Sequence, residues 1–486
     1  MKTVKTKIAL FAAAAAVAGA GCRTTEEILR DYERDFSAGN YEKAAEEVSK
    51  LSEDKDKNEC LWRLHAGTAL MFAGKNKEAL EQFNGTEDVF ENEDAKSVFA
   101  QTGDGALAML NNDTSFNYDG GGQDRIFTCL YKAQIYASLG HSNATRSELN
   151  RSQAHQDMWL DERKKDISAA AERLEQDSAA YRKEKGEDGN AGDDGKGAAG
   201  ALSDKGLAKS IYDGCGYDMA NGGRIETLSR KDYVNAYASH VNGIFRWLDG
   251  SGGQASLREV AELRRGNATL ARDAAECASA VKKPSGQIWV YVEDGLCPVR
   301  EEWRIDLPLF LIPGLNKYVL YSGMAFPKLR KRAAAGAGWR VSNGSAVAQM
   351  EMLQDVDALM KTEYDVYMRG ALAREITRTI VKTGTQIALG IAEHNASGRA
   401  KTMLMLSRIA AAGWHAGTVG ADIRSWTALP QTVWETRIDR PASGKIEIAS
   451  ATGKYAVDVP HEGNAMVFFR IPSAAAQPSV RVVRLP

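Results

Sequence analysis

The hydrophobic pattern of this chain changes its period near residue 283, and that change limits the folds open to it. Before this point, apolar residues recur at helical spacing in segments separated by glycine-rich turns. After it, short runs of β-branched and aromatic residues are bounded by Gly and Pro, as strands are. The pattern therefore predicts an α+β protein, with a helical N-terminal half and a β-rich C-terminal half.

Weak repeats organise the helical half. The stretches Ala38–Val48 and Ala73–Phe83 superpose with their Gly residues thirty-five positions apart, and Ser138–Leu149 adds a third, degenerate copy. This is the spacing of tetratricopeptide repeats, in which a small residue, here Ala44 and Ala79, lets two antiparallel helices approach closely. We expect a tetratricopeptide-like domain over residues 22–182.

A second helical unit is expected over residues 206–282, because Asp232–Leu263 again reads as helix, Gly-rich turn and helix. The two units are separated by residues 183–205, which begin "KEKGEDGNAGDDGKGAAG". This segment is too polar and too rich in glycine to bury a core, so it is interpreted as a linker.

The C-terminal half, residues 283–486, is expected to be a β-sandwich-like domain with a helical insertion at about 354–419. The insertion contains a long amphipathic pattern over Asp355–His394, whose apolar stripe is expected to pack on the sheet rather than on a membrane. The expected strands are Gly286–Asp294, Glu301–Leu309, Asn316–Gly323 and the stretches "QTVWETRID", "GKIEIASA", "KYAVDVP" and "NAMVFFRIP".

The N-terminus has the pattern of a bacterial lipoprotein signal. Three lysines precede the apolar run Ile8–Ala18, which is too short to span a bilayer, and the small residues Gly19-Ala20-Gly21 lead directly to Cys22. This resembles a lipobox, so residues 1–21 are expected to be removed and Cys22 to be acylated; a plain secretory signal is the alternative. Arg23 in the next position favours the outer membrane, and the following polar residues predict a short tether before a helix near Ile28.

Composition narrows the partners. The formal net charge is −2, which argues against nucleic acid, and no later segment is apolar enough to cross a membrane. The five further cysteines are odd in number and lack C-x-x-C spacing, so no metal site is predicted and no cofactor motif is present. Cys60 and Cys129 would be the first disulfide pair to test, but buried free thiols are favoured for the whole set: Cys60, Cys129, Cys215, Cys277 and Cys297.

Asp422, Arg424 and Trp426, in the stretch "ADIRSWTALP", form the strongest candidate site. A charged pair beside an indole is typical of a binding hot spot. The favoured alternative is structural: Asp422 and Arg424 fix the crossover from the helical insertion to the next strand, and Trp426 fills the core beneath it. The lone His415 is interpreted as structural. The stretch "DGGGQD", with Asp119 and Asp124, lacks the residues of a phosphate loop and predicts a turn between helices.

Five stretches together carry a family resemblance: "YVNAYASHVNGIFRWLDG", "VEDGLCPVREEWRIDLPLF", "SGMAFPKL", "REITRTIVK" and "ADIRSWTALP". They resemble, in order, an uncharacterised family of bacterial envelope lipoproteins. The resemblance implies a tetratricopeptide-like front, a β-rich back and a lipid anchor. Members are often encoded beside the lipoprotein that activates a peptidoglycan-synthesising penicillin-binding protein, which implies work in the cell envelope but no assigned reaction.

Two functions follow from these patterns. The preferred one is a lipid-anchored, non-enzymatic module whose helical groove binds a protein, because stacked helix pairs form extended grooves. The alternative is a hydrolase or transferase acting on envelope glycans with acids such as Asp119, Asp124 or Asp422, which would require two carboxylates converging across a cleft. No catalytic residue is assigned.

Overall fold

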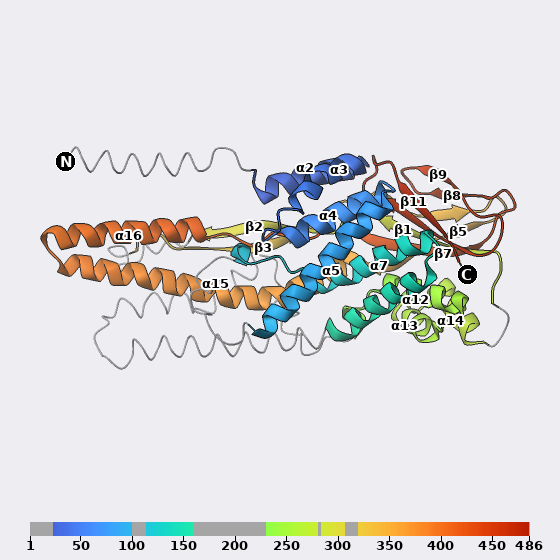
Figure 1. Ribbon diagram of the computed structural model, residues 1–486, viewed down its shortest axis with the longest axis horizontal. Helices are drawn as coiled ribbons and strands as arrows, with labels where there is room; N and C mark the ends of the chain where they lie inside the picture. The colour runs from blue at the N-terminus through green and yellow to red at the C-terminus, as the bar shows by residue number, and fades with distance from the viewer. Residues whose placement is uncertain (1–22, 100–112, 160–229, 280–282, 307–318, 486) are drawn as a thin grey trace.

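The computed structural model describes residues 23–99, 113–159, 230–279, 283–306 and 319–485 (Figure 1). The predicted signal peptide, Cys22, the linker at 183–205 and Cys215 lie outside these ranges. The fold is mixed α/β, with helices in the N-terminal half and sheets in the C-terminal half. The predicted change of period is therefore confirmed, and none of the described sheets closes into a barrel.

The N-terminal helices form pairs. Their bounds are α2 (Thr25–Ser37), α3 (Tyr41–Leu51), α4 (Glu59–Phe72), α5 (Asn76–Phe99) and α7 (Gly122–Ser138), followed by a helical stretch at 142–159. Each turn inside a pair contains one of the predicted repeat glycines: Gly39, Gly74 and Gly140 have φ of 80°, 80° and 77°. Other residues adopt this left-handed conformation only with strain, so glycine marks these turns in the sequence.

Helix α2 begins at Thr25, earlier than the expected start near Ile28. The Thr24 hydroxyl accepts a hydrogen bond from the Glu27 amide, and the Glu27 carboxylate accepts one from the Thr24 amide. This reciprocal capping box satisfies two amides at the helix start. The predicted polar tether is accordingly shorter than expected.

Within residues 230–279, the second helical unit contains one more helix than predicted. It comprises α12 (Ala236–Asp249), α13 (Gln254–Leu263) and α14 (Ala268–Ala278), and short 3₁₀ turns, η2 (Asp113–Ser115) and η4 (Arg230–Asp232), precede the helices α7 and α12. Gly250 ends α12 with a φ of 83°, at the predicted Gly-rich turn. These helices pack against the same sheet as the N-terminal pairs.

A five-stranded sheet with the order β11-β10-β1-β7-β6 forms the centre. Its strands are β1 (Gln287–Asp294), β6 (Glu351–Asp355), β7 (Thr432–Asp439), β10 (Ala465–Ile471) and β11 (Ser479–Arg484). β1 and β10 pair in parallel and are buried along their whole length. Successive side chains point to opposite faces, so Ile288 and Val290 join one core while Trp289 and Tyr291 join the other.

The helices cover one face of the five-stranded sheet, and a four-stranded sheet covers the other (Figure 1). The second sheet has the order β5-β4-β8-β9. Its strands are β4 (Arg340–Ser342), β5 (Val347–Gln349), β8 (Lys445–Ala449) and β9 (Lys454–Asp458). Trp339 and Phe469 contact each other in the core that the two sheets share.

A helical hairpin of α15 (Val356–Asn395) and α16 (Gly398–Thr418) extends away from the sheets (Figure 1). Its bounds are close to those of the predicted helical insertion, about 354–419. β2 (Val299–Asp306) and β3 (Gly323–Arg330) pair beside it, and β3 packs on α15. The predicted strand at Asn316–Gly323 is wrong over Val319–Ser322, and Gly323 is the first residue of β3. The Gln386 side chain of α15 accepts hydrogen bonds from the backbone amides of Leu320 and Tyr321, which removes the donors that a strand would use.

Candidate functional site

The segment from Asp422 to Trp426 joins α16 to β7, as predicted, and its Arg424 is a buried connection point. Arg424 is 4% exposed, and its guanidinium donates to both carboxylate oxygens of Asp422 at 2.8 and 2.9 Å. It also donates to the side-chain oxygen of Asn58 at 3.0 Å and to the backbone carbonyl of Phe116 at 3.0 Å. One side chain therefore joins the start of α4, the chain before α7 and the crossover.

Trp426 points into the helical half. Its ring is fully buried, with centroids 5.9 Å from Tyr131 and 6.3 Å from Phe83, and its Nε1 donates to Thr68 at 3.0 Å. These partners belong to α4, α5 and α7, so the chain's own crossover fills the helical face where we had expected a protein groove. The arrangement agrees with the structural interpretation of Asp422, Arg424 and Trp426.

His65 strengthens this junction. Its Nδ1 lies 2.8 Å from the carbonyl oxygen of Leu61, and its Nε2 accepts from the backbone amide of Thr427 at 3.3 Å. Burial lowers the pKa of His65 to about 4, so the ring is neutral at physiological pH. The neutral form fits this donor and acceptor pattern.

A cavity of about 360 Å³ lies next to the junction, where α15 leaves the body. Its walls come from the "DGGGQD" segment, Trp159, β2, α15 and the crossover. The turn predicted for "DGGGQD" covers only Asp119–Gly121, because Gly122 begins α7.

Asp119, Asp124 and Asp422 all line the cavity. These are the three acids named as candidate catalytic residues for the glycan-acting alternative. Arg300 of β2 also lines the cavity. Sequence reasoning missed it because a single arginine in a polar strand carries no local signal.

Two of these acids are already engaged. Arg424 holds both oxygens of Asp422, and Oδ2 of Asp124 accepts from the Tyr118 hydroxyl at 2.7 Å and from the Gly121 amide at 2.8 Å. Burial raises the pKa of Asp124. Asp124 therefore caps the start of α7, and Asp422 is not available as an unpaired base.

His415 is buried near the base of the hairpin. Its Nε2 lies 3.2 Å from the carbonyl oxygen of Gly323, and its Nδ1 lies 3.3 Å from the Gln386 amide nitrogen. Burial lowers its pKa to about 4. These contacts agree with the structural role expected for it.

The described cysteines are free thiols: Cys60, Cys129, Cys277 and Cys297. The candidate Cys60–Cys129 disulfide is therefore not formed. Cys129 lies in a group with Glu87 and Glu148 whose ligand atoms are within 4.8 Å of one another. Lys132 forms ion pairs with both glutamates, and Arg151 pairs with Glu87 at 2.6 Å, so a metal ion would have to displace the ammonium group.

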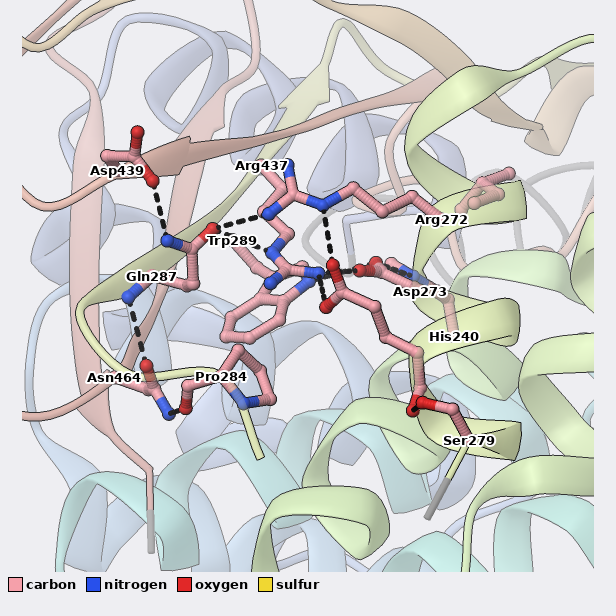
Figure 2. Close-up of polar contacts among 12 residues, drawn as sticks. His240, Arg272, Asp273, Ser279, Pro284, Gln287, Trp289, Arg437, Asp439 and Asn464 are labelled. Carbon is pink, nitrogen blue, oxygen red and sulfur yellow. Dashed lines mark hydrogen bonds and ion pairs between the residues drawn. The ribbon is translucent and has the colours of Figure 1, made fainter. Parts of the chain in front are cut away.

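A buried polar network fixes α14 to the sheet (Figure 2). Arg437 of β7 donates to Asp273 at 2.7 Å and to Gln287 at 2.9 Å, and the Trp289 indole donates to Asp273 at 2.9 Å. His240 lies 3.2 Å from Asp273 and 3.0 Å from the hydroxyl of Tyr291. This resembles a proton-transfer relay, but His240, Asp273 and Tyr291 are almost completely buried, and the ion pair of Arg437 with the partly exposed Glu276 links them to the surface. We interpret the network as structural.

The α15–α16 hairpin has the opposite character. Six of the thirteen large hydrophobic side chains found exposed in the described chain lie on it, which singles it out from the rest of the surface. They are Ile391, Met403, Met405, Leu406, Ile409 and Trp414. Met403 is the most exposed, at 70%. Helix α16 carries Arg399, Lys401 and Arg408 and no acidic residue.

Within the described residues, no helix combines the length and the apolar character needed to cross a bilayer. Comparison with models of protein families, with curated proteins and with solved structures returned no significant match.

Proposed function

We propose that this chain is a lipid-anchored protein of the cell envelope that acts as a non-enzymatic protein-binding or scaffold module. Its helix pairs are interpreted as degenerate tetratricopeptide-like repeats, and its two packed sheets as a β-sandwich. The α15–α16 hairpin is the proposed binding surface. Acylated Cys22 provides the attachment, with the outer membrane as the proposed location.

The exposed face of α16 is the observation that carries this proposal. Met403, Leu406 and Ile409 recur at helical spacing and are 70%, 45% and 51% exposed. A helix that leaves its apolar side chains in water loses the burial that normally stabilises it. A partner that covers these side chains would restore that contribution.

The positive charge of α16 indicates the surface charge expected of its partner. Arg399 and Lys401 are exposed, whereas Arg408 pairs with Glu393 of α15 at 3.2 Å. The hairpin tip therefore combines apolar contact area with positive charge. It fits a protein surface with an apolar centre and an acidic border, because complementary charges orient a partner and accelerate its encounter.

The test combines affinity capture from detergent-solubilised envelopes with titration of the captured protein against purified chain. The double variant Met403→Glu/Ile409→Glu removes the apolar face. Val347→Glu is the matched control, because Val347 is 63% exposed on β5, away from the hairpin. We expect one protein to bind wild type and Val347→Glu equally, and the double variant at least about tenfold more weakly.

Equal binding by the double variant would overturn this surface. So would exclusive binding of the hairpin to phosphatidylglycerol vesicles, which would identify a lipid contact instead. Replacing residues 1–22 by a plain, cleavable secretory signal is expected to move the chain to the soluble fraction without changing the affinity for the partner. Retention of that form in the membrane fraction would contradict the proposed anchor.

The engaged acids make the glycan-acting alternative weaker. Asp422 is paired with Arg424, and Asp124 caps α7. The same purified chain, incubated with peptidoglycan, is expected to release no soluble fragments. Release that Asp124→Asn abolishes would favour the enzyme instead.

A further inference from the structure

Arg300 is a cation that lines the cavity and forms no ion pair with the described residues. Its guanidinium donates to the backbone carbonyl of Arg424 at 3.3 Å and lies 4.9 Å from the ring centre of Tyr367. No carboxylate of the described chain lies within 4.0 Å of it. Since a guanidinium has five N–H donors, most of its hydrogen-bonding capacity is unused.

The neighbouring arginines are different. Arg374, which also lines the cavity, pairs with Asp113 at 2.7 Å, and Arg424 pairs with Asp422 at 2.8 Å. A partly buried charge without a counter-ion lowers the stability of the fold, so a counter-ion is expected beside Arg300. A bound anionic group would act as this counter-ion, because a guanidinium group can donate two parallel hydrogen bonds to a carboxylate.

Unsatisfied polar atoms gather around the same cavity. Oδ1 of Asp124, Nε1 of Trp159 and Oγ of Ser425 are buried and lack a hydrogen-bond partner among the described residues, and all three residues line the cavity. Asp124 itself is 2% exposed. Buried polar groups are normally paired, so three orphaned atoms around one cavity indicate a place where polar contacts are incomplete.

The charges define what the cavity can accept. Of the charged side chains that line it, Arg374 and Asp422 already have ionic partners, whereas Arg300 and Asp124 form no ion pair with the described residues. A simple anion on Arg300 would leave Asp124 without a counter-charge, and a simple cation would leave Arg300 without one. We propose that the cavity binds a small zwitterion, an α-amino acid or a short peptide, with its carboxylate on Arg300 and its ammonium group toward Asp124.

The size and the remaining walls agree with such a ligand. About 360 Å³ lies at the lower end of the range found for ligand pockets. Tyr118 and Tyr367 provide aromatic surface for the aliphatic part of the molecule. The site is independent of the proposed protein-binding face on α16, because no exposed α16 side chain lines the cavity.

The glycines of "DGGGQD" have a role in this cavity. A Cβ on Gly122 would lie 1.9 Å from Cδ1 of Trp159, and one on Gly121 would lie 2.7 Å from a carboxylate oxygen of Glu363. Both distances are shorter than real contacts, so side chains here would displace the walls. The glycine run is thus explained by close backbone packing around the cavity.

The test is isothermal titration calorimetry of the full mature chain with L- and D-amino acids and dipeptides as probes. Propionate and propylamine, which carry one charge each, serve as controls. We expect at least one zwitterion to bind, and each single-charge control to bind at least about tenfold more weakly. Arg300→Gln is expected to weaken zwitterion binding at least about tenfold.

Arg304→Gln is the matched control, because Arg304 lies on the same strand but pairs outside the cavity with Asp306 at 3.1 Å. It should bind like wild type. Arg300→Lys retains the charge and removes the planar fork, so it should fold and still bind more weakly. Circular dichroism verifies the fold of each variant.

If no probe binds at concentrations up to about 10 mM, the proposal is overturned, because a weaker dissociation constant would leave the cavity empty. Equal binding of propionate or propylamine would also overturn it, as would equal weakening by Arg304→Gln. The comparison of probes on wild type remains decisive even if Arg300→Gln does not fold. None of these outcomes depends on the Met403→Glu/Ile409→Glu measurement.

Discussion

Trp414 and Trp426 lie close in the sequence but in opposite environments. Trp426 is fully buried among α4, α5 and α7, and its indole donates a hydrogen bond to Thr68. Trp414 on α16 is 42% exposed, and Lys382 lies 5.0 Å from its ring centre. The crossover completes the core of the body, whereas the hairpin leaves apolar surface uncovered. Apolar character alone therefore does not distinguish core from contact surface here.

The arginines of the two regions repeat this difference. Arg424 is buried and satisfied by a carboxylate, an amide oxygen and backbone carbonyls. Arg399 is exposed near the start of α16. Removing a buried, paired charge leaves its partners unsatisfied, whereas removing an exposed one has little effect. The two regions should therefore respond to substitution on different scales.

The largest effect is expected for Trp426→Ala. Removing a fully buried indole leaves a cavity in the helical core and should lower the free energy of unfolding by about 3 to 5 kcal/mol. Trp414→Ala should change it by less than about 1 kcal/mol. Urea unfolding followed by circular dichroism measures both. Equal losses for the two tryptophans would break the comparison.

Arg424→Ala should lower the free energy of unfolding by about 2 to 4 kcal/mol, because Asp422 and Asn58 lose their donor inside the protein. Arg424→Lys keeps the charge and should recover part of this loss. Arg399→Ala should remain within about 0.5 kcal/mol of wild type. Thermal and urea unfolding of the three variants would decide whether Arg424 connects the segments as described.

The His65 contact predicts a pH dependence of the junction. The folded-state pKa of about 4 lies below the unfolded value of 6.5, so the stabilisation is complete above pH 6.5 and is lost as the pH falls toward 4. The loss attributable to His65 is up to about 3 kcal/mol at pH 4. His65→Gln should flatten the profile of unfolding free energy, and His394→Gln, at the exposed end of α15, should not. An unchanged profile in His65→Gln would contradict this assignment.

Met403→Glu should have the smallest effect on stability. Met403 is 70% exposed, so the free energy of unfolding should stay within about 0.5 kcal/mol of wild type. Urea unfolding followed by circular dichroism measures it. A large loss of stability would place Met403 in the core instead of on the contact surface.

Local features of the fold could be predicted from the sequence. Gly39 and Gly74 mark turns because their positive φ values favour glycine in any context. The apolar runs of β1 and β10 indicate strands because both faces of these strands are buried. β11 was missed because its apolar–polar alternation covers only Val480, Arg481 and Val482 before Val483 breaks it. β4 and β5 are three residues each, too short for a periodicity to develop.

The site was only partly predictable. The Asp422–Arg424 pair could be anticipated because the residues are two positions apart. Asn58 and Thr68, which satisfy Arg424 and Trp426, lie more than three hundred positions away, and no local pattern connects them. Five separate parts of the chain line the cavity. The role of Arg300 therefore depends on the tertiary fold and could not be predicted from its neighbours in the sequence.

The start of α2 has a consequence for how an anchored chain would be oriented. Arg23 forms ion pairs with Asp31 of α2 and Glu47 of α3, and Thr24 caps α2. Cys22 directly precedes Arg23 in the chain, and consecutive Cα atoms are only about 3.8 Å apart. With Cys22 acylated, the body would have almost no slack relative to the lipid surface. The end of the body formed by α2 and α3 would therefore stay close to the lipid surface when the hairpin meets a partner.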